Sequence, residues 1–551
     1  MKLKNADMDM LHGPLIKKLL FFTLPIALSS MLQQLFNAAD TAVVGYFGNQ
    51  DALAAVGTNT EIVALIVTVS SGLSIGANIL VAGLIGKNRK EEFPSAIRTS
   101  IVMSVIIGIF GMISGQFVAE PLLRLIQAPE GILRDATLYL RIYMLGYPFL
   151  LLYDFGSAVL RARGDSRYPF LALAFSGIAN IGLNLFFVIV FRMGVAGVAV
   201  ATGISNMLSA LIVLHRLAKE SRTYADSSEP RFSLRDMGEI LKTGVPSALQ
   251  GAVFCFANIF VQASVNSFGE TAIAGSTVAM NFEYFTYYVI TAFGQTATTF
   301  TGQNHAAGQK ERCRKILWFC LLLSTVCSSV PIFTIVLFRD FFAGLFTPDP
   351  AVIESAGVRI LCILLFEPLC NLYEIPAGVL RGSGHALYPA LGTMIGTCAF
   401  RIIWICTVFR ENPTLPVLYR AFPLSWCATI LLVCGGFFRD TVRGKGKTKT
   451  RRRAGRVCRI ISVPDKYSHP TFLWSDGSTN FDLSISNYNK LNLKFDIRVG
   501  VLSMLFGILA VLNRKLRAAV QTAKTHHAPV LNPDRVLIAH LNRLNGAFFC
   551  T

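Results

Sequence analysis

Long apolar stretches, separated by short polar connections, recur along the first 440 residues of the chain. Each is close to or above the roughly 20 residues that an α-helix needs to cross the hydrocarbon core of a membrane. We therefore expect an all-α membrane protein with twelve transmembrane helices. Their predicted positions are about 15–45, 52–84, 94–118, 133–160, 168–191, 195–217, 240–268, 272–303, 314–338, 354–380, 386–409 and 415–438.

The charged residues of the connections follow an alternating pattern. Every second connection is rich in Lys and Arg, and cytoplasmic loops are enriched in these residues. The rule predicts that both termini lie in the cytoplasm, and we expect a multi-pass protein of the plasma membrane. The basic connections carry Lys2, Lys4, Lys17 and Lys18; Lys87, Arg89 and Lys90; Arg161, Arg163 and Arg167; Arg216, Lys219, Arg222, Arg231 and Arg235; Lys310, Arg312, Arg314 and Lys315; and Arg381.

The two ends of the chain differ in composition. Only 15% of the 551 residues are charged, far fewer than in a soluble protein of this size. Residues 439–551 carry 20 Lys and Arg against 6 Asp and Glu, whereas the first 438 residues carry 31 against 26. The basic excess thus belongs mostly to the tail, so we expect a lipid bilayer as the main partner and no nucleic acid.

One loop sequence occurs twice. Residues 159–169 read "VLRARGDSRYP" and residues 379–389 read "VLRGSGHALYP", 220 positions later. Pro148 and Pro368 share this offset, and Asn37 matches Asn258 at an offset of 221. Because each half would hold six spans, an even number, both halves enter the membrane in the same direction and form a parallel repeat. We expect an N-terminal six-helix lobe at 1–225, a C-terminal six-helix lobe at 226–440 and a basic tail at 441–551.

The repeated loop predicts a hinge between two helices. Gly164 and Gly384 allow a tight turn, and Pro169 and Pro389 sit near helix starts, where proline costs little. A role in folding alone is the other interpretation. The tail, which begins with "RGKGKTKTRRRAGR", allows three interpretations. It is a basic extension near anionic headgroups, a small appended domain, or unrelated sequence from a frameshift or gene-model error.

Carboxylates inside predicted spans mark candidate functional sites, because a charge in the bilayer is costly. Asp40 lies deep in the first span, within "LFNAADTAVVGYFG". A buried carboxyl group can exchange a proton near neutral pH, and its ionised form attracts Na⁺ or an organic cation. A hydrogen bond to a neighbouring helix is the structural alternative.

Further polar residues inside spans allow more than one interpretation. Asn180 and Asn184 lie one turn apart and offer amide groups to a cation or to a helix partner. Glu283, beside "YFTYY", suits a lipophilic cation or simple aromatic packing. Asp154 and Glu374 lie near the repeated loop, where gating or capping contacts are expected. Glu367 precedes Pro368 and equally suits a kink.

Several known enzyme motifs are missing from the sequence. "GKGKT" (444–448) lacks the upstream glycine of a P-loop, since position 441 is Thr. The chain has no H-E-x-x-H or nucleotide-binding fingerprint, and its twelve cysteines form no C-x-x-C pair. We expect no enzyme activity and no cofactor. Coupling to an ion gradient is then the economical route to active transport.

These motifs resemble the multidrug and toxic compound extrusion (MATE) family. "LFNAADTAVVGYFG", "GxxNIGLNLFFV", the paired "VLRxxGxxxYP" loops and "GQNHAAGQ" (302–309) carry the resemblance, which covers about residues 10–440. It implies two six-helix lobes and export of small organic cations in exchange for Na⁺ or H⁺ by alternating access. We expect a monomer.

The resemblance also implies site residues. The family's first-helix aspartate falls on Asp40, where Na⁺ could bind, and its fifth-helix polar pair resembles Asn180 and Asn184. Many members have Asp at the second of these positions, so Asn184 is a departure. "PSALQGAVFCFANIF" lacks a seventh-helix glutamate that some branches carry, which favours the N-terminal lobe. The predicted cation-coupling residues are Asp40, Asn180, Asn184 and Thr202, with Glu283 and Glu374 as substrate or second-lobe candidates.

Two alternative functions stay open from the sequence. A flippase of lipid-linked precursors, from the same superfamily, commonly has extra helices and a cationic central cavity, whereas the candidate charges here are mostly acidic. A membrane-embedded enzyme or receptor would not explain the repeat of six spans.

Overall fold

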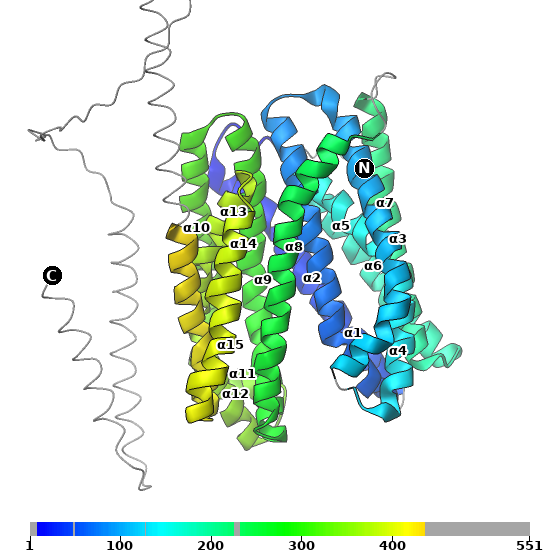
Figure 1. Cartoon of the computed structure of the whole chain (residues 1–551), viewed down its shortest axis with the longest axis vertical. Coiled ribbons are helices and arrows are strands. Elements are labelled where there is room, and N and C mark those ends of the chain that lie inside the picture. The colour runs from blue at the N-terminus through cyan, green and yellow to red at the C-terminus, as the bar shows by residue number, and fades with distance from the viewer. Residues whose placement is uncertain (1–7, 48–49, 127, 225–231, 436–551) are drawn as a thin grey trace, which may run out of the picture. The chain divides into compact units, whose positions relative to one another are not determined.

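The computed structural model describes residues 8–47, 50–126, 128–224 and 232–435. Within these ranges the regular elements are all helices. Figure 1 shows the blue-to-cyan helices of the first half gathered on one side and the green-to-yellow helices of the second half on the other. The predicted basic tail at 441–551 lies outside the described residues.

The first half of the chain forms a bundle of long helices. Their length follows from the long apolar runs, which pack against one another and leave other apolar side chains at the surface. The helices are α1 (Leu15–Phe47), α2 (Gln50–Gly86), the short η1 (Lys90–Glu92), α3 (Phe93–Leu125), α4 (Glu130–Leu145), α5 (Tyr147–Ala162), α6 (Arg167–Leu185) with a π-helical end η2 (Phe186–Val190), and α7 (Gly194–Tyr224).

The second half repeats this plan with more interruptions. Its elements are α8 (Leu234–Asn266), α9 (Glu270–Ala306), α10 (Lys310–Leu337), α11 (Arg339–Gly344), α12 (Pro350–Cys362), η3 (Leu364–Cys370), α13 (Asn371–Gly382), α14 (Leu387–Thr393), η4 (Met394–Ala399), α15 (Phe400–Trp404) and η5 (Ile405–Phe409). One further helix, Leu415–Gly435, ends the described part. The elements from α14 to η5 together make one span, Leu387–Phe409.

The described residues contain nine helices that are long and apolar enough to cross a membrane, or ten if a bent pair counts as one span. This confirms a helical protein that passes the membrane many times. The 37-residue helix α9 and the interrupted run from α12 to α13 are not among them. The predicted count of twelve spans therefore stays a prediction.

Two of the predicted spans are broken at proline positions that correspond in the repeat. The span predicted at 133–160 bends by 46° between α4 and α5, next to Pro148. The span predicted at 354–380 is interrupted by the 3-10 helix η3, which contains Pro368. Proline lacks the N–H that continues a helix and its ring clashes with the preceding turn. Glu367 lies in η3 beside Pro368, so the helices of both predicted spans are interrupted at the corresponding prolines.

The repeated loops adopt the tight turn that the sequence predicts. Gly164 has a φ angle of +99° and Gly384 one of +85°. Only glycine adopts this left-handed region without a steric cost. A Cβ atom on Gly164 would also lie 2.6 Å from the backbone oxygen of Met8.

The two halves meet mainly along α2, which packs against α8 and α9. A Cβ atom on Gly76 would lie 2.1 Å from the backbone oxygen of Ile240, so the two helices touch backbone to backbone. Further along, Thr299 Oγ1 donates to Asn78 Oδ1 at 3.1 Å, and Gln303 donates to the Ala162 carbonyl oxygen at 2.7 Å. These contacts close one end of the interface between the lobes.

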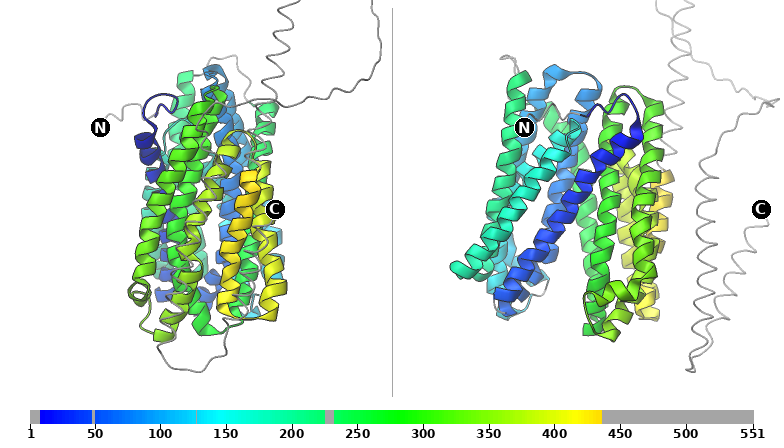
Figure 2. Two further views of the ribbon diagram at one scale, coloured as in Figure 1. Left: turned by 90° about the vertical axis from the view of Figure 1, so that its left-hand side faces the viewer. Right: turned by 180° about the vertical axis from the view of Figure 1, so that it is seen from behind.

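Helix α1 contacts both halves. Seen from behind in Figure 2, it runs obliquely, with its N-terminal end beside the second-half helices. There, Thr23 and Thr296 share a hydrogen bond of 2.8 Å, and the rings of Phe22 and Phe300 lie 5.4 Å apart. The other end of α1 packs on α6 of the first half.

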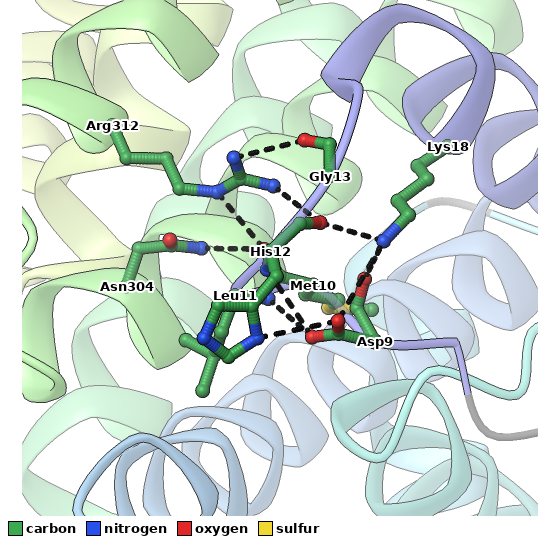
Figure 3. A network of polar contacts seen from close by, with 8 residues as sticks. All are labelled: Asp9, Met10, Leu11, His12, Gly13, Lys18, Asn304 and Arg312. Carbon is green, nitrogen blue, oxygen red and sulfur yellow. Dashed lines mark hydrogen bonds and ion pairs between the residues drawn. The ribbon is translucent and has the colours of Figure 1, made fainter.

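Residues 8–13, here called the N-terminal strap, seal the same closed end (Figure 3). Arg312 donates to the backbone oxygens of Met10, His12 and Gly13 at 3.0–3.3 Å, and Asn304 donates to Met10 at 3.1 Å. Since Met8 also packs against Gly164 of the first half, the strap ties the two halves together.

Asp9 organises the strap itself. Its carboxylate accepts hydrogen bonds from the backbone N–H groups of Leu11 and His12 and lies 3.9 Å from the Lys18 ammonium. Partial burial would raise the pKa of Asp9, but these N–H groups and the charge of Lys18 outweigh it and lower that pKa.

Candidate functional site

The structure brings Asp40, Asn180, Asn184 and Thr202 together. Asp40 comes from the second half of α1, the two asparagines from α6 and Thr202 from α7. The asparagines share one face of α6 because they are four residues apart. Asp40 is 6% exposed, Asn180 3% and Asn184 fully buried, so the cluster lies inside the first half.

Hydrogen bonds link the four side chains in a ring. The Asn184 amide donates to Asp40 Oδ1 and, at 3.2 Å, to Asn180 Oδ1. Thr202 Oγ1 donates to Asp40 Oδ2 at 3.1 Å, or alternatively to the Val198 carbonyl at 3.0 Å. The Asn180 amide is 3.5 Å from Thr202 Oγ1. Both carboxylate oxygens of Asp40 are thus held by neutral donors.

Among the described residues, Asp40 has no partner of opposite charge. In the part of the chain that the structure describes, no Lys, Arg or His forms an ion pair with its carboxylate. A buried carboxylate without a counter-charge is costly in a membrane. A bound proton or a bound cation would relieve that cost, and this is what the arrangement can do chemically.

The oxygen atoms of the cluster suit a small hard cation. The carboxylate of Asp40, the amide oxygens of Asn180 and Asn184 and the hydroxyl of Thr202 all belong to the donor type that such ions prefer. The amide oxygen of Asn184 is buried and has no hydrogen-bond partner, which leaves one acceptor available. With one carboxylate, the site fits a monovalent ion better than a divalent one.

Two tyrosines beside this cluster were not predicted from the sequence. Tyr139 and Tyr143 of α4 are buried, stack with their ring centroids 6.2 Å apart, and lie within electrostatic reach of Asp40. Their spacing of four residues puts them on one face of α4. That spacing is the signal in the sequence that would have found them.

The second-lobe candidates lie in ion pairs of their own, on α9 and α13. Glu283 is paired with Arg359 through two contacts of 2.8 Å. Glu374 is paired with Arg381 on the same helix, and both side chains are about one-tenth exposed. Neither glutamate joins the Asp40 cluster by a contact, so the structure places these candidates apart from it.

The other two intramembrane carboxylates differ in their partners. Glu367 accepts a hydrogen bond from Thr286 at 2.5 Å. Asp154 has a buried Oδ2 atom without a hydrogen-bond partner and feels the charge of Arg161, two turns later on α5. Asp154 and Arg161 correspond in the repeat to Glu374 and Arg381, but of these four described residues only Glu374 and Arg381 form an ion pair.

Two buried cations in the second half also escaped the sequence analysis. Arg359 is 4% exposed and Arg401 is fully buried. Both fall within predicted spans, at 354–380 and 386–409, where a cation is as costly as a carboxylate. Searching those spans for charges of either sign would have found them.

Two repeated helical lobes in a membrane, with one buried carboxylate held by neutral polar side chains in the first lobe, are typical of a membrane transporter. The MatE profile matches residues 25–186 and again residues 246–407, one copy in each half. The chain belongs to the MatE family of transporters, and the predicted resemblance and parallel repeat are confirmed.

Curated relatives and solved structures agree with this assignment. The chain is 29% identical over 380 residues to the "Probable multidrug resistance protein YpnP" of Bacillus subtilis, covering 69% of this chain and 85% of that protein. It is 28% identical over 445 residues to the "Probable multidrug resistance protein NorM" of Thermotoga maritima, covering 78% and 91%. A crystal structure of MATE in complex with MaD3S superimposes with a TM-score of 0.72 at 22% identity, over 81% of this chain and all of that one, and shows the shared fold.

Proposed function

We propose that this protein exports small organic cations, drugs among them, across the plasma membrane in exchange for Na⁺ or H⁺. The family is one of transporters, and two relatives carry names that describe multidrug resistance. The protein acts by alternating access, as a monomer, and needs no cofactor besides the coupling ion. Both termini lie in the cytoplasm.

The buried carboxylate of Asp40 carries this proposal. Its two oxygens are bonded only to neutral groups of Asn184 and Thr202, so its ionised form calls for a cation. A proton, Na⁺ and a cationic solute can each supply the charge. Because only one of them is needed at a time, binding of the ion and binding of the solute exclude each other, which is the requirement for exchange.

The closed end of the interface supports one direction of access. With the termini in the cytoplasm, the N-terminal strap and the α2–α8 contact close the cytoplasmic side. The ion then enters the cluster from the outside, and the solute leaves to the outside through the same open side. Rocking of the lobes, after release of the strap, opens the cluster to the cytoplasm.

Glu283 and Glu374 remain the candidates for solute contact in the second lobe. Each now balances an arginine, Arg359 or Arg381. A cationic solute that approached either glutamate would compete with that arginine. This makes the second-lobe role weaker in electrostatic terms than the role of Asp40, where no such competitor is present.

The test is export of a fluorescent lipophilic cation from cells that lack their own exporters. We compare the native chain with Asp40→Asn and, as a matched control, with Asp340→Asn, since the Asp340 side chain is 73% exposed. The native chain and the control should export the dye and Asp40→Asn should not, at equal membrane expression. Equal export by all three would contradict the proposal.

The coupling ion and the solute class are then separated with purified protein. Binding of the lipophilic cation should weaken when Na⁺ is added or when the pH is lowered, and the effective change identifies the ion. If neither Na⁺ nor pH changes binding of the cation, and the protein binds a lipid-linked anionic precursor, the flippase alternative is favoured over the exporter.

A further inference from the structure

The second lobe contains a buried cation without a counter-ion. Arg401, on α15, is fully buried, and in the part of the chain that the structure describes no Asp or Glu forms an ion pair with it. Its guanidinium donates to Asn258 Oδ1 at 3.0 Å and to Ser425 Oγ at 3.2 Å, which are both neutral acceptors. One nitrogen, Nη2, is buried with no partner at all.

Arg359 provides the comparison within the same lobe. It is also buried, but its charge is balanced by Glu283 through two hydrogen bonds of 2.8 Å. A buried charge without such a partner costs several kcal/mol, and a buried donor without an acceptor adds to that cost. Arg401 therefore lacks what Arg359 has, namely an oxyanion.

Aromatic rings surround the unpaired guanidinium. It lies 4.0 Å from the ring centroid of Phe422 and 5.5 Å from that of Phe254. Cation–π contacts stabilise a guanidinium in part but leave its in-plane N–H donors free. Phe254 and Asn258 on α8 are only partly buried, so the buried Arg401 side chain lies directly behind residues that reach the protein surface.

The repeat shows that the charge is reversed between the lobes. Pro169 and Pro389 correspond at an offset of 220, but the π-helical turn η4 takes up one more residue than an α-helical turn does. After it the offset is 221, as in the two family matches, so Arg401 corresponds to Asn180. At the same offset Val261 replaces Asp40. The first lobe thus presents a carboxylate and the second a guanidinium.

We propose that Arg401, with Asn258 and Ser425, binds the oxyanion group of an aromatic solute, a carboxylate or a sulfonate. The guanidinium fork offers paired N–H donors to such a group, and the rings of Phe254 and Phe422 pack against the aromatic body. The oxyanion supplies the acceptor that Nη2 lacks. A solute with both a positive and a negative group would then bind Asp40 in the first lobe and Arg401 in the second.

This inference concerns binding and does not rest on the proposed ion exchange. Its test uses the purified full-length chain in nanodiscs of phosphatidylcholine, where transport plays no part. The probes are naphthalene-2-sulfonate, the matched cation 2-naphthyltrimethylammonium and inorganic sulfate. Thermal unfolding is followed with each probe over a range of concentrations.

Naphthalene-2-sulfonate should raise the melting temperature of the native chain, and more so than sulfate at equal concentration. Arg401→Met should weaken sulfonate binding by about 10- to 100-fold, the loss expected for a charge-assisted hydrogen-bond pair. Binding of the naphthyl cation should not change. Asp40→Asn should bind the sulfonate as the native chain does, so a failed exchange mechanism would not affect this result.

Stability without a probe separates a ligand site from a structural role. Arg401→Met should unfold at the same temperature as the native chain or higher, because it removes an unpaired charge, whereas Arg359→Met should unfold earlier. If Arg401→Met does not fold, Arg401 is structural and the proposal is overturned. Arg401→Lys, which keeps the charge without the fork, should bind the sulfonate more weakly than the native chain.

Two further outcomes would overturn the proposal. One is equal sulfonate binding by the native chain, Arg401→Met and Arg401→Lys. The other concerns the difference in melting temperature between the native chain and Arg401→Met. If added phosphatidylglycerol raises the melting temperature of the native chain above that of the variant, and the sulfonate does not, the ligand is a lipid headgroup.

Discussion

The ion pair between Glu283 and Arg359 allows a sharp prediction about which role the glutamate has. Arg359 Nε and Nη2 each lie 2.8 Å from a carboxylate oxygen of Glu283, and its Nη1 donates to Ser276 at 2.7 Å. The Arg359 side chain is 5% exposed and that of Glu283 is 12% exposed. The pair joins α9 to α12, so its geometry is that of a structural link between helices.

Changing one partner should be costly and changing both should not. Glu283→Gln leaves the Arg359 guanidinium buried and unpaired, so we expect the free energy of unfolding to fall by about 3–5 kcal/mol. The double variant Glu283→Met with Arg359→Met removes both charges and should be as stable as the native chain, or more stable by about 1–4 kcal/mol. The two single changes are therefore strongly non-additive.

The assay measures stability and export on the same set of variants. Unfolding of the purified chain is titrated with dodecyl sulfate in mixed micelles, and dye export is measured in cells at matched expression. If Glu283 is structural, the double variant recovers both stability and export. A double variant that is stable but does not export would refute this reasoning and assign Glu283 to solute contact. A Glu283→Gln variant as stable as the native chain would refute the expected loss of about 3–5 kcal/mol.

Three further predictions follow from the first lobe and the closed end. Asn184→Asp adds a second carboxylate to the cation site and should tighten Na⁺ binding, measured by calorimetry, by about 10-fold; unchanged affinity would speak against the site. Gly76→Val should force apart the closed end at a cost of about 1–3 kcal/mol, and amide hydrogen exchange in the N-terminal strap should become faster. Gly83→Val is the control, because no atom lies near its Cβ position, and it should leave exchange unchanged. Because the pKa of Asp9 is lowered, its ionised form stabilises the strap above the usual aspartate pKa, and this contribution is lost as the pH falls through the lowered value. Strap exchange, corrected for its intrinsic pH dependence, should therefore rise in acid, and Asp9→Asn should abolish that rise; a rise that persists in the variant would contradict the assignment.

The helical architecture and the repeat could be predicted because both are local in the sequence. Apolar run length defines a span, and the matched Pro148 and Pro368 mark the points where two of them break. The glycines of the repeated loops were predicted for the same reason, since a tight turn depends on a few adjacent residues. Run length alone locates these two spans but does not show the breaks inside them, because it does not register a missing N–H.

Contacts between distant segments could not be predicted in this way. The partner of Glu283 lies 76 residues away, and the hydrogen bond between Thr299 and Asn78 joins residues separated by 221 positions. No local pattern encodes such pairs. The Asp40 cluster was anticipated through the family resemblance, and its geometry agrees, but its role in coupling stays a prediction.

The N-terminal strap has a consequence for how the protein is made. The strap leaves the ribosome well before the residues that hold it, because Asn304 and Arg312 follow Met10 by 294 and 302 residues. At a synthesis rate of about 5–20 residues per second, that delay is about 15–60 seconds. The first lobe must therefore insert and pack with its leading segment undocked. Docking of the strap then marks the moment when the two halves of the newly made chain have met.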